Sequence, residues 1–297
     1  MQNVFKRRTV KKHISPVAVI LLVLLVLYAL MLIGLLFWAF MTSFKSQQEF
    51  RLNVIGFPKT WVWNYTFVFQ MYLYPVFTEA GTEYVGMGLM FLYSLLYAAG
   101  CAFTATLVPC ITSYLCARFP YKFGKIVYLI VIVTMVIPIV GNQPSEIQIA
   151  QFFGLYDQIW GLWLMKANFL GMYFLVFFAI FRGIPKEYEE AAKMDGAGNF
   201  SILMKIMLPL IRNTFLVVML IRFIEFWNDY QTPLIYLKSY PTVALGMFNM
   251  ANTRENGLST VPMRMTGAML MLLPILAIFL VFQKHLIGNI TVGGIKG

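Results

Sequence analysis

Charged side chains inside an apolar stretch are the first residues in this sequence whose chemistry stands out. Arg222, Glu225, Asn228 and Asp229 all lie within the stretch 216–237. Spacings of three and four residues place Arg222, Glu225 and Asp229 on one face of a helix. Charges inside a membrane are costly, so they normally face a protein interior or a water-filled cavity. Two interpretations stay open: Arg222 and Glu225 form a structural ion pair, or this face lines a polar translocation path.

The sequence offers no plausible catalytic set. Its two histidines are His13, in a basic tail, and His285, near the end of the chain, and neither belongs to a Ser/His/Asp group. The three cysteines, Cys101, Cys110 and Cys116, form no C-x-x-C pair and have no histidine nearby. They are therefore expected to be packing residues rather than a disulfide or a metal site.

Composition places the chain among integral membrane proteins. Of its 297 residues, 60% are hydrophobic and only 12% are charged. A helix needs about 20 apolar residues to cross a bilayer. Six stretches qualify, so we predict an all-α integral membrane protein with six transmembrane helices, at about residues 16–41, 88–115, 124–141, 159–181, 209–236 and 265–283.

This pattern divides the chain into two parts. Residues 1–87 contain a basic tail, the first transmembrane helix and an extracytoplasmic segment, and residues 88–297 form a five-helix core. With six spans, both termini lie on one side of the membrane, and most of the 23 Lys and Arg residues lie on that side too. The positive-inside rule makes it the cytoplasmic side. The net charge of +11 is therefore a topology signal, and we expect no binding to nucleic acid.

The glycines near the C-terminus do not make a nucleotide site. Gly288 and Gly293 are spaced as in a P-loop, but Gly294 stands where the lysine must be. We therefore expect no nucleotide, metal or other cofactor on this chain, and we predict that it is not an enzyme.

The longest polar segment on the cytoplasmic side, 185–209, reads as a helix, a turn and a second helix. Pro185 is suited to open a helix, and glutamates at 187, 189 and 190 place negative charge at the positive end of its dipole. Gly196 tolerates left-handed geometry and should stop the helix with a positive φ. Residues 200–207 read as a second short helix, and Pro209 falls where the next membrane helix could begin.

Several separated positions in this segment resemble the "EAA" loop of ABC importer permeases. The loop 184–209 matches in particular the version found in sugar transporters, and it implies a coupling helix, between the fourth and fifth membrane helices, that docks in a groove of a separate ATPase subunit. The matching residues are Glu190, Ala191, Ala192, Asp195, Gly196, Ile206, Leu208 and Pro209. The stretches 113–119 and 227–236 are also similar to this family.

The resemblance covers about residues 55–297 and implies a permease subunit of a binding-protein-dependent ABC importer of the maltose and oligosaccharide type. Such a subunit is a multi-pass protein of the bacterial inner membrane, embedded in the lipid bilayer. Its implied partners are a second homologous permease, two ATPase subunits that hold ATP and Mg, an extracytoplasmic solute-binding protein and the sugar itself. The alternatives are a stand-alone secondary transporter or channel that uses the charges at 222–229, and an ABC permease for a non-sugar solute.

Two segments on the outer side leave alternatives open. The aromatic residues of 42–86 could form an interfacial belt, or a rim that meets a delivery protein or stacks on sugar rings. The polar residues of 142–151 could line a wet vestibule or belong to an exposed loop.

Overall fold

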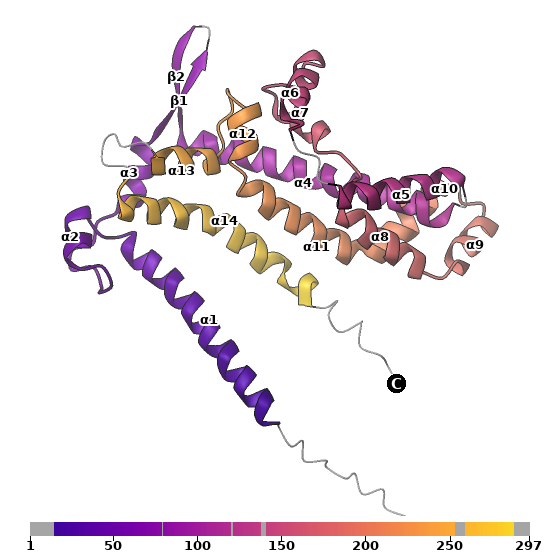
Figure 1. The fold of residues 1–297 in the computed structure, drawn as a ribbon, viewed down its shortest axis with the longest axis horizontal. Coiled ribbons are helices and arrows are strands. Elements are labelled where there is room, and N and C mark those ends of the chain that lie inside the picture. The colour runs from indigo at the N-terminus through magenta and orange to yellow at the C-terminus, as the bar shows by residue number, and fades with distance from the viewer. Residues whose placement is uncertain (1–14, 79, 120, 138–140, 253–258, 288–297) are drawn as a thin grey trace, which may run out of the picture.

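The computed structural model describes residues 15–78, 80–119, 121–137, 141–252 and 259–287, and most of them are helical (Figure 1). Four of these helices are long and apolar enough to cross a membrane. They are α1 (Pro16–Thr42), α4 (Met87–Arg118), α11 (Leu208–Trp227), which continues a helical run from Asn199, and α14 (Val261–Ile287). The predicted basic tail and glycine-rich C-terminus lie outside the described residues.

Shorter helices join and cover the long ones. They are α2 (Gln47–Leu52), α3 (Asn64–Met71), α5 (Lys122–Val136), α6 (Gln143–Phe152), α7 (Ile159–Met165), α8 (Met172–Gly183), α9 (Glu187–Met194), α10 (Asn199–Ile202), the π-helical turn η1 (Leu203–Met207), α12 (Gln231–Tyr236) and α13 (Val243–Asn252). Helix α9 lies at the right-hand end of the molecule in Figure 1, whereas the start of α1 and the end of α14 lie below the bundle.

Three of the six predicted membrane helices differ from the expectation. Helix α5 has 15 residues and spans about 22 Å, less than the roughly 30 Å of a bilayer core. The stretch 159–181 is interrupted between α7 and α8, where Gly171 has a φ of 115°. The stretch 209–236 is interrupted between α11 and α12. Uniform apolar composition hid these breaks, because they depend on which backbone groups find partners in neighbouring elements.

The expectation of an all-α chain is wrong for one outer segment. Strands β1 (Leu73–Thr78) and β2 (Gly81–Gly86) form an antiparallel hairpin, which projects from the bundle in Figure 1. The aromatic residues before it pack around the buried ring of Phe44, whose centroid lies 5.2–5.3 Å from those of Trp61, Trp63 and Tyr65. These rings thus stabilise the outer segment itself.

Helix α4 is the centre of the bundle. It packs against α7, α8, α11 and α13, and its alanines and Gly100 allow neighbouring helices to approach closely. Trp163 of α7 lies directly over Gly100, where an added Cβ would come within 2.1 Å of the indole, and its Nε1 donates to the carbonyl of Leu96 at 3.1 Å. Cys101 and Cys110 are buried in this helix as free thiols, as the expectation of packing residues requires.

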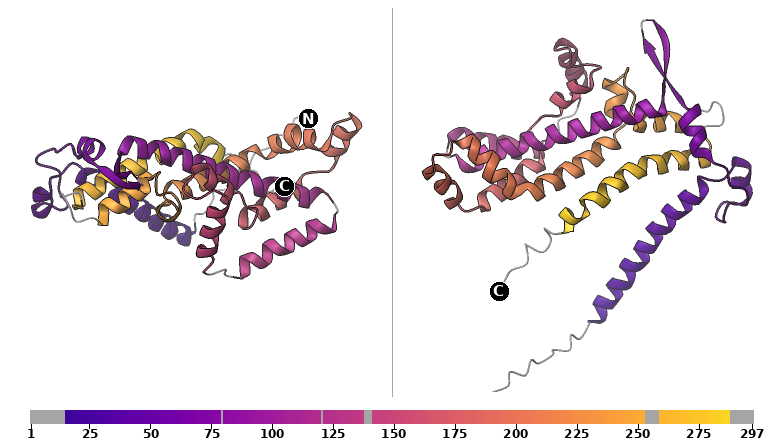
Figure 2. Two further views of the ribbon diagram at one scale, coloured as in Figure 1. Left: turned by 90° about the horizontal axis from the view of Figure 1, so that it is seen from above. Right: turned by 180° about the vertical axis from the view of Figure 1, so that it is seen from behind.

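Helix α1 stands apart from the bundle. It diverges from the other helices toward its N-terminal end (Figure 2), and its most apolar window has no buried residue. Its last turn is tied to α14, because Thr266 donates its hydroxyl proton to the carbonyl of Ser43 at 3.2 Å. This exposure suits a helix that lipid surrounds.

The polar segment 142–151 is a helix, α6, and not an exposed loop. It lies mostly exposed beside α12, where the hydroxyl of Tyr236 donates to Glu146 at 3.2 Å. The turn after it is fixed by Asp157, which adopts a φ of 58° and accepts hydrogen bonds from the backbone N–H and the hydroxyl of Ser239. The segments 142–157 and 231–240 are therefore joined into one structural unit.

Candidate functional site

Helix α9 is a short, charged helix at the end of the bundle where α4 ends and the run into α11 begins (Figure 1). Its first turn carries glutamates at 187, 189 and 190, and its last turn carries Lys193, so the charges of both ends suit the helix dipole. Pro185 precedes the helix, two positions before its first residue. The predicted first helix is therefore confirmed.

Gly196 ends α9 in the predicted left-handed conformation. Its φ is 81°, and its N–H donates to the carbonyl of Lys193 at 3.0 Å, while the N–H of Ala197 donates to that of Ala192 at 2.9 Å. These two bonds define a Schellman motif, and Ala192 and Ala197 both belong to the apolar cluster at this end of the bundle. No atom lies within 4 Å of an added Cβ, so the conformation and not the space favours glycine.

The second helix of the segment does not end before Pro209. Residues 199–227 form one continuous helical run in which η1 is a π-helical turn. At this turn the N–H of Leu208 donates to the carbonyl of Leu203, five residues back. Pro209, which lacks an N–H, follows directly. Helix α11 thus begins at Leu208, one residue before the predicted position, but it continues the preceding helical run without a break.

A buried ion pair that the sequence did not predict holds α9 against α4. Arg118, at the end of α4, lies with its Nε 3.2 Å from Oε1 of Glu189, and the two side chains are 4% and 11% exposed. The same guanidinium donates from Nη2 to the carbonyl of Ile184 at 2.8 Å. One arginine therefore joins three segments: the end of α4, the link after α8, and α9.

The outer face of α9 is open. A groove of about 530 Å³ lies between α9 and η1 and is lined by Ala191, Ala192, Asp195 and Ile206 together with two neighbours, Glu187 and Tyr188. Of the predicted coupling residues, Glu190, Ala191, Asp195, Gly196 and Pro209 are exposed, Ile206 and Leu208 are half-buried, and Ala192 is buried.

Large apolar side chains are exposed around the same groove. Tyr188, Met194 and Phe200 are 51%, 84% and 76% exposed. These residues come from α9 and the start of α10, at the tip of the molecule. A set of exposed apolar residues next to charged ones is typical of a surface that another protein covers.

The ion pair expected in the fifth membrane helix is present, but it does not face the core of this chain. Nη1 of Arg222 lies 2.9 Å from Oε2 of Glu225, and the two side chains are 26% and 47% exposed. The guanidinium carbon lies 4.4 Å from the ring centroid of Tyr173 on α8. The structural ion pair is therefore present, but the chain by itself does not bury it, and the polar path stays a prediction.

Asp229 does not share a helix face with this pair, because α11 ends at Trp227. Its carboxylate accepts hydrogen bonds from the hydroxyl of Tyr97 and from the backbone N–H of Thr232, both at 3.0 Å. Asn228 is exposed and donates back to the carbonyl of Ile224 at 2.9 Å. The aspartate thus ties the break after α11 to α4, which periodicity alone could not show.

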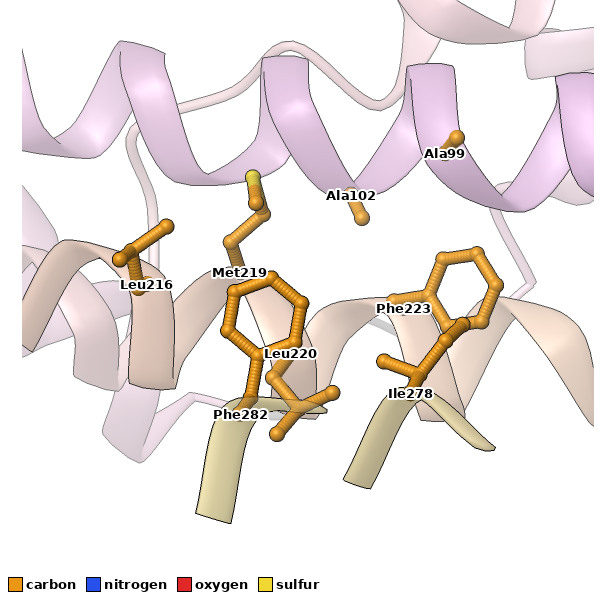
Figure 3. A pocket seen from close by; sticks show the side chains of 8 residues that line it. All are labelled: Ala99, Ala102, Leu216, Met219, Leu220, Phe223, Ile278 and Phe282. Atoms are coloured by element: carbon orange, nitrogen blue, oxygen red, sulfur yellow. The ribbon is translucent and has the colours of Figure 1, made fainter. Parts of the chain in front are cut away.

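An apolar cavity lies between α4, α11 and α14 (Figure 3). It has a volume of about 170 Å³ and is lined by Ala99, Ala102, Leu216, Met219, Leu220, Phe223, Ile278 and Phe282. None of these side chains offers a strong hydrogen-bond donor or acceptor, whereas a polar ligand needs a few convergent polar groups. This cavity is therefore apolar and offers a sugar no strong hydrogen-bond partner among its lining side chains.

Residues 110–291 match the family described as the inner membrane component of binding-protein-dependent transport systems. The chain belongs to this family. The match includes α9, its Schellman turn and α11, so the residues that resemble the EAA loop stand inside the shared region. Members of this family are membrane components of importers, which favours the importer over a stand-alone secondary transporter or channel.

Individual relatives are permeases of sugar transport systems. The chain is 28% identical to the arabinooligosaccharides transport system permease protein AraQ of Bacillus subtilis over 184 residues, which are 61% of this chain and just under two thirds, 64%, of that protein. It is 25% identical to the diacetylchitobiose uptake system permease protein NgcG of Streptomyces coelicolor, over 91% of this chain and 86% of NgcG.

A solved structure has the same fold. It is a chain of a bacterial ABC transporter involved in the import of the acidic polysaccharide alginate, with a TM-score of 0.72 and 20% identity. The likeness covers 90% of this chain and 95% of that one. This permease is thus an integral membrane protein whose fold matches that of an importer subunit.

The buried ion pair predicts a difference between two adjacent glutamates. We expect Glu189→Ala to lower the thermal midpoint of unfolding strongly, because it leaves Arg118 buried without an anion, a loss of about 3–5 kcal/mol in comparable pairs. Glu190→Ala, which changes an exposed side chain, should leave the midpoint nearly unchanged. A thiol-reactive dye can follow unfolding in detergent, since Cys101 and Cys110 are buried in the folded chain.

The double variant Arg118→Met/Glu189→Met is the control for this experiment. It removes both charges and should recover part of the lost stability. Equal midpoints for Glu189→Ala and Glu190→Ala would show that the ion pair does not hold α9.

Proposed function

We propose that this chain is one of two permease subunits of an ABC importer that moves oligosaccharides or related sugars across the bacterial inner membrane. The observation that carries the proposal is α9: a rigid helix at the tip of the bundle, closed by a Schellman turn, tied to α4 by a buried ion pair, and open on its other face. Sugar as the substrate class is supported by relatives whose names include arabinooligosaccharides, diacetylchitobiose and maltodextrin.

The proposed topology keeps six membrane crossings with both termini in the cytoplasm. The four long helices provide four crossings. Helix α5 with the residues after it, and α7 with α8, provide the other two as shorter or interrupted segments. Residues 1–87 then form the anchoring part and residues 88–297 the permease core. Helix α9 lies on the cytoplasmic side with the start of α1 and the end of α14, in agreement with the charge distribution.

The proposed coupling site is the open face of α9 and its turn. Its contact residues are Glu190, Ala191, Ala192, Asp195, Gly196, Ile206, Leu208 and Pro209, with Tyr188, Met194 and Phe200 added from the exposed apolar set. A groove of an ATPase subunit would cover these side chains. ATP and Mg are held by two such subunits, and this chain supplies no nucleotide site.

Coupling follows from the rigidity of this connection. When ATP closes the ATPase dimer, a docked α9 moves with the ATPase. The ion pair between Arg118 and Glu189 then passes this motion to α4, which packs against most of the bundle. The two permeases thereby turn from an inward-facing to an outward-facing state, and a solute-binding protein releases sugar into the cavity. Differential contacts in the two states bias this switch.

The proposed translocation path uses the exposed polar face of α11. Arg222, Glu225 and the ring of Tyr173 form one cluster on the outside of this chain, and Asn228 is exposed beyond it. We place this face against a water-filled space shared with the second permease, because a half-exposed ion pair is costly in lipid. Asp229 would support the structure behind the path without contacting the sugar, because its carboxylate is bonded to Tyr97 and Thr232.

The first test is assembly and activity. This chain, expressed with the second permease, the ATPase and the binding protein that its genome encodes nearby, should copurify with the permease and the ATPase. ATP hydrolysis by the complex should rise when the loaded binding protein is added. A monodisperse preparation of this chain alone that transports sugar would contradict the proposal.

The second test concerns the turn after α9. We expect Gly196→Val to reduce sugar-stimulated ATP hydrolysis and uptake at least about tenfold, because a β-branched residue in left-handed geometry costs about 1–2 kcal/mol or more and tilts α9. Gly196→Asn is the matched control, since asparagine tolerates this geometry and the site has room for its side chain.

In both variants, membrane insertion and sugar binding by the separate binding protein should stay unchanged. Glu190→Ala should give a milder loss of stimulated hydrolysis. Full coupled transport by Gly196→Val would mean that α9 is only a linker.

The third test concerns the polar face of α11. We expect a cysteine in Glu225→Cys to react with a membrane-impermeant thiol reagent in the assembled complex, and sugar to slow the reaction. Leu24→Cys on α1, where the leucine is 57% exposed, is the lipid-facing control and should react only with a lipid-dissolved probe. Reaction of position 225 with the lipid-dissolved probe alone would place the ion pair against lipid.

A further inference from the structure

A second cavity lies at the same end of the bundle as α9, between the end of α4, the start of α5 and the end of α8. Its volume is about 490 Å³, and its lining includes the cationic side chains of Lys125, Arg182 and Lys186. The view from above in Figure 2 shows α5 leaving the bundle at an angle. Gly124 allows the two helices to meet closely where they diverge, since an added Cβ there would lie 3.3 Å from Cα of Cys116.

The cations of this cavity have no anionic partner among the described residues. Only two salt bridges occur in the described part of the chain, and neither contains Lys125, Arg182 or Lys186. Arg118 also lines the cavity, but Glu189 neutralises it. No aspartate or glutamate belongs to the lining. The cavity therefore has a net charge of about three positive units, counted from these side chains, that a bound anion would compensate.

Aromatic rings give the cavity a fixed wall. The rings of Tyr128 and Phe178 lie 4.8 Å apart, and Phe178 packs on the guanidinium of Arg182 at 5.7 Å. Tyr121 adds an exposed phenol at the mouth. Arg182 is thus held by a cation–π contact while its N–H groups stay available.

Helix α5, which contributes Gly124, Lys125 and Tyr128 to the cavity, also has an exposed apolar face. Ile126, Leu129 and Val133 recur along α5 at helical spacing and are 53%, 60% and 42% exposed. They follow Lys125 along the helix, away from the basic end. A cationic pocket beside an exposed apolar stretch of the same helix is complementary to an amphiphile with an anionic head and an apolar tail.

We propose that this cavity binds the phosphate group of an anionic phospholipid of the cytoplasmic leaflet, and that the acyl chains lie along α5. The proposal rests on the orientation given under the proposed function, which places the cavity at the depth of the inner headgroups. The phosphate accepts hydrogen bonds from Lys125, Arg182 and Lys186. A free phosphate ion would satisfy the same donors, but it would make no apolar contact with the exposed face of α5.

Lipid retention by the assembled complex tests this site. The complex is purified in mild detergent, phosphatidylglycerol or phosphatidylcholine with the same acyl chains is titrated in, and native mass spectrometry counts the bound lipids. We expect one phosphatidylglycerol per copy of this chain to be retained in preference to phosphatidylcholine. The triple variant Lys125→Gln/Arg182→Gln/Lys186→Gln should weaken that binding by about tenfold or more.

A second triple variant separates a site from general surface charge. Lys122→Gln/Lys205→Gln/Arg212→Gln removes the same charge from the same side of the membrane, at residues that do not line the cavity. It should retain phosphatidylglycerol like the unchanged complex. Equal loss in both triple variants, or in neither, overturns the proposal. If the first triple variant does not assemble, the single variants Lys125→Gln and Arg182→Gln replace it, each with a smaller expected loss.

Inorganic phosphate distinguishes the two sources of the anion. An excess of phosphate should not displace phosphatidylglycerol from the complex, because the free ion lacks the apolar contacts with α5. Displacement by phosphate would identify a small-anion site and overturn the lipid proposal. The subunit composition of each sample shows separately whether the importer assembled, so a failure of the proposed function is distinguishable from a failure of lipid binding.

Discussion

The buried ion pair between Arg118 and Glu189 is the interaction on which the α9 end of this permease depends. It is nearly closed to solvent, and the same arginine also binds the carbonyl of Ile184. Around it, the apolar cluster of Tyr114, Phe181 and Ala192 keeps water out. Such a pair contributes little net stability relative to a well-packed apolar core, but losing one partner is costly. It therefore acts as a specific connection that fixes where α9 lies on α4.

One helix, α4, connects this ion pair to the opposite end of the bundle. Helix α4 is the common neighbour of α7, α8, α11 and α13, and small residues along it allow close packing. At its far end, Tyr97 binds Asp229 and Ser94 accepts from the backbone of Val243. One continuous helix therefore connects the ion pair beside α9 with the segments that contain Asp229 and Val243. Helix α1, by contrast, takes little part in this packing.

The polar residues of the membrane helices have two different roles that their spacing did not separate. Asp229 is a structural acceptor that satisfies the backbone where α11 stops, as buried polar groups require. Arg222 and Glu225 neutralise each other on the outside of the chain, next to Tyr173. The end of α11 at Trp227 separates Arg222 and Glu225, which stay on the helix, from Asp229, which lies beyond it and bonds to α4.

The sequence by itself determined the membrane class, the four long helices, α9 with its glycine turn, and the family, because each depends on composition or on residues close together in the chain. The positive φ of Gly196 and the ion pair between Arg222 and Glu225 were also predictable from the sequence. Tertiary structure decided the partner of Glu189, the breaks at 166–171 and 228–230, the helix α6 and the β-hairpin. These depend on where buried charges and backbone groups find partners far along the chain, which local patterns do not specify.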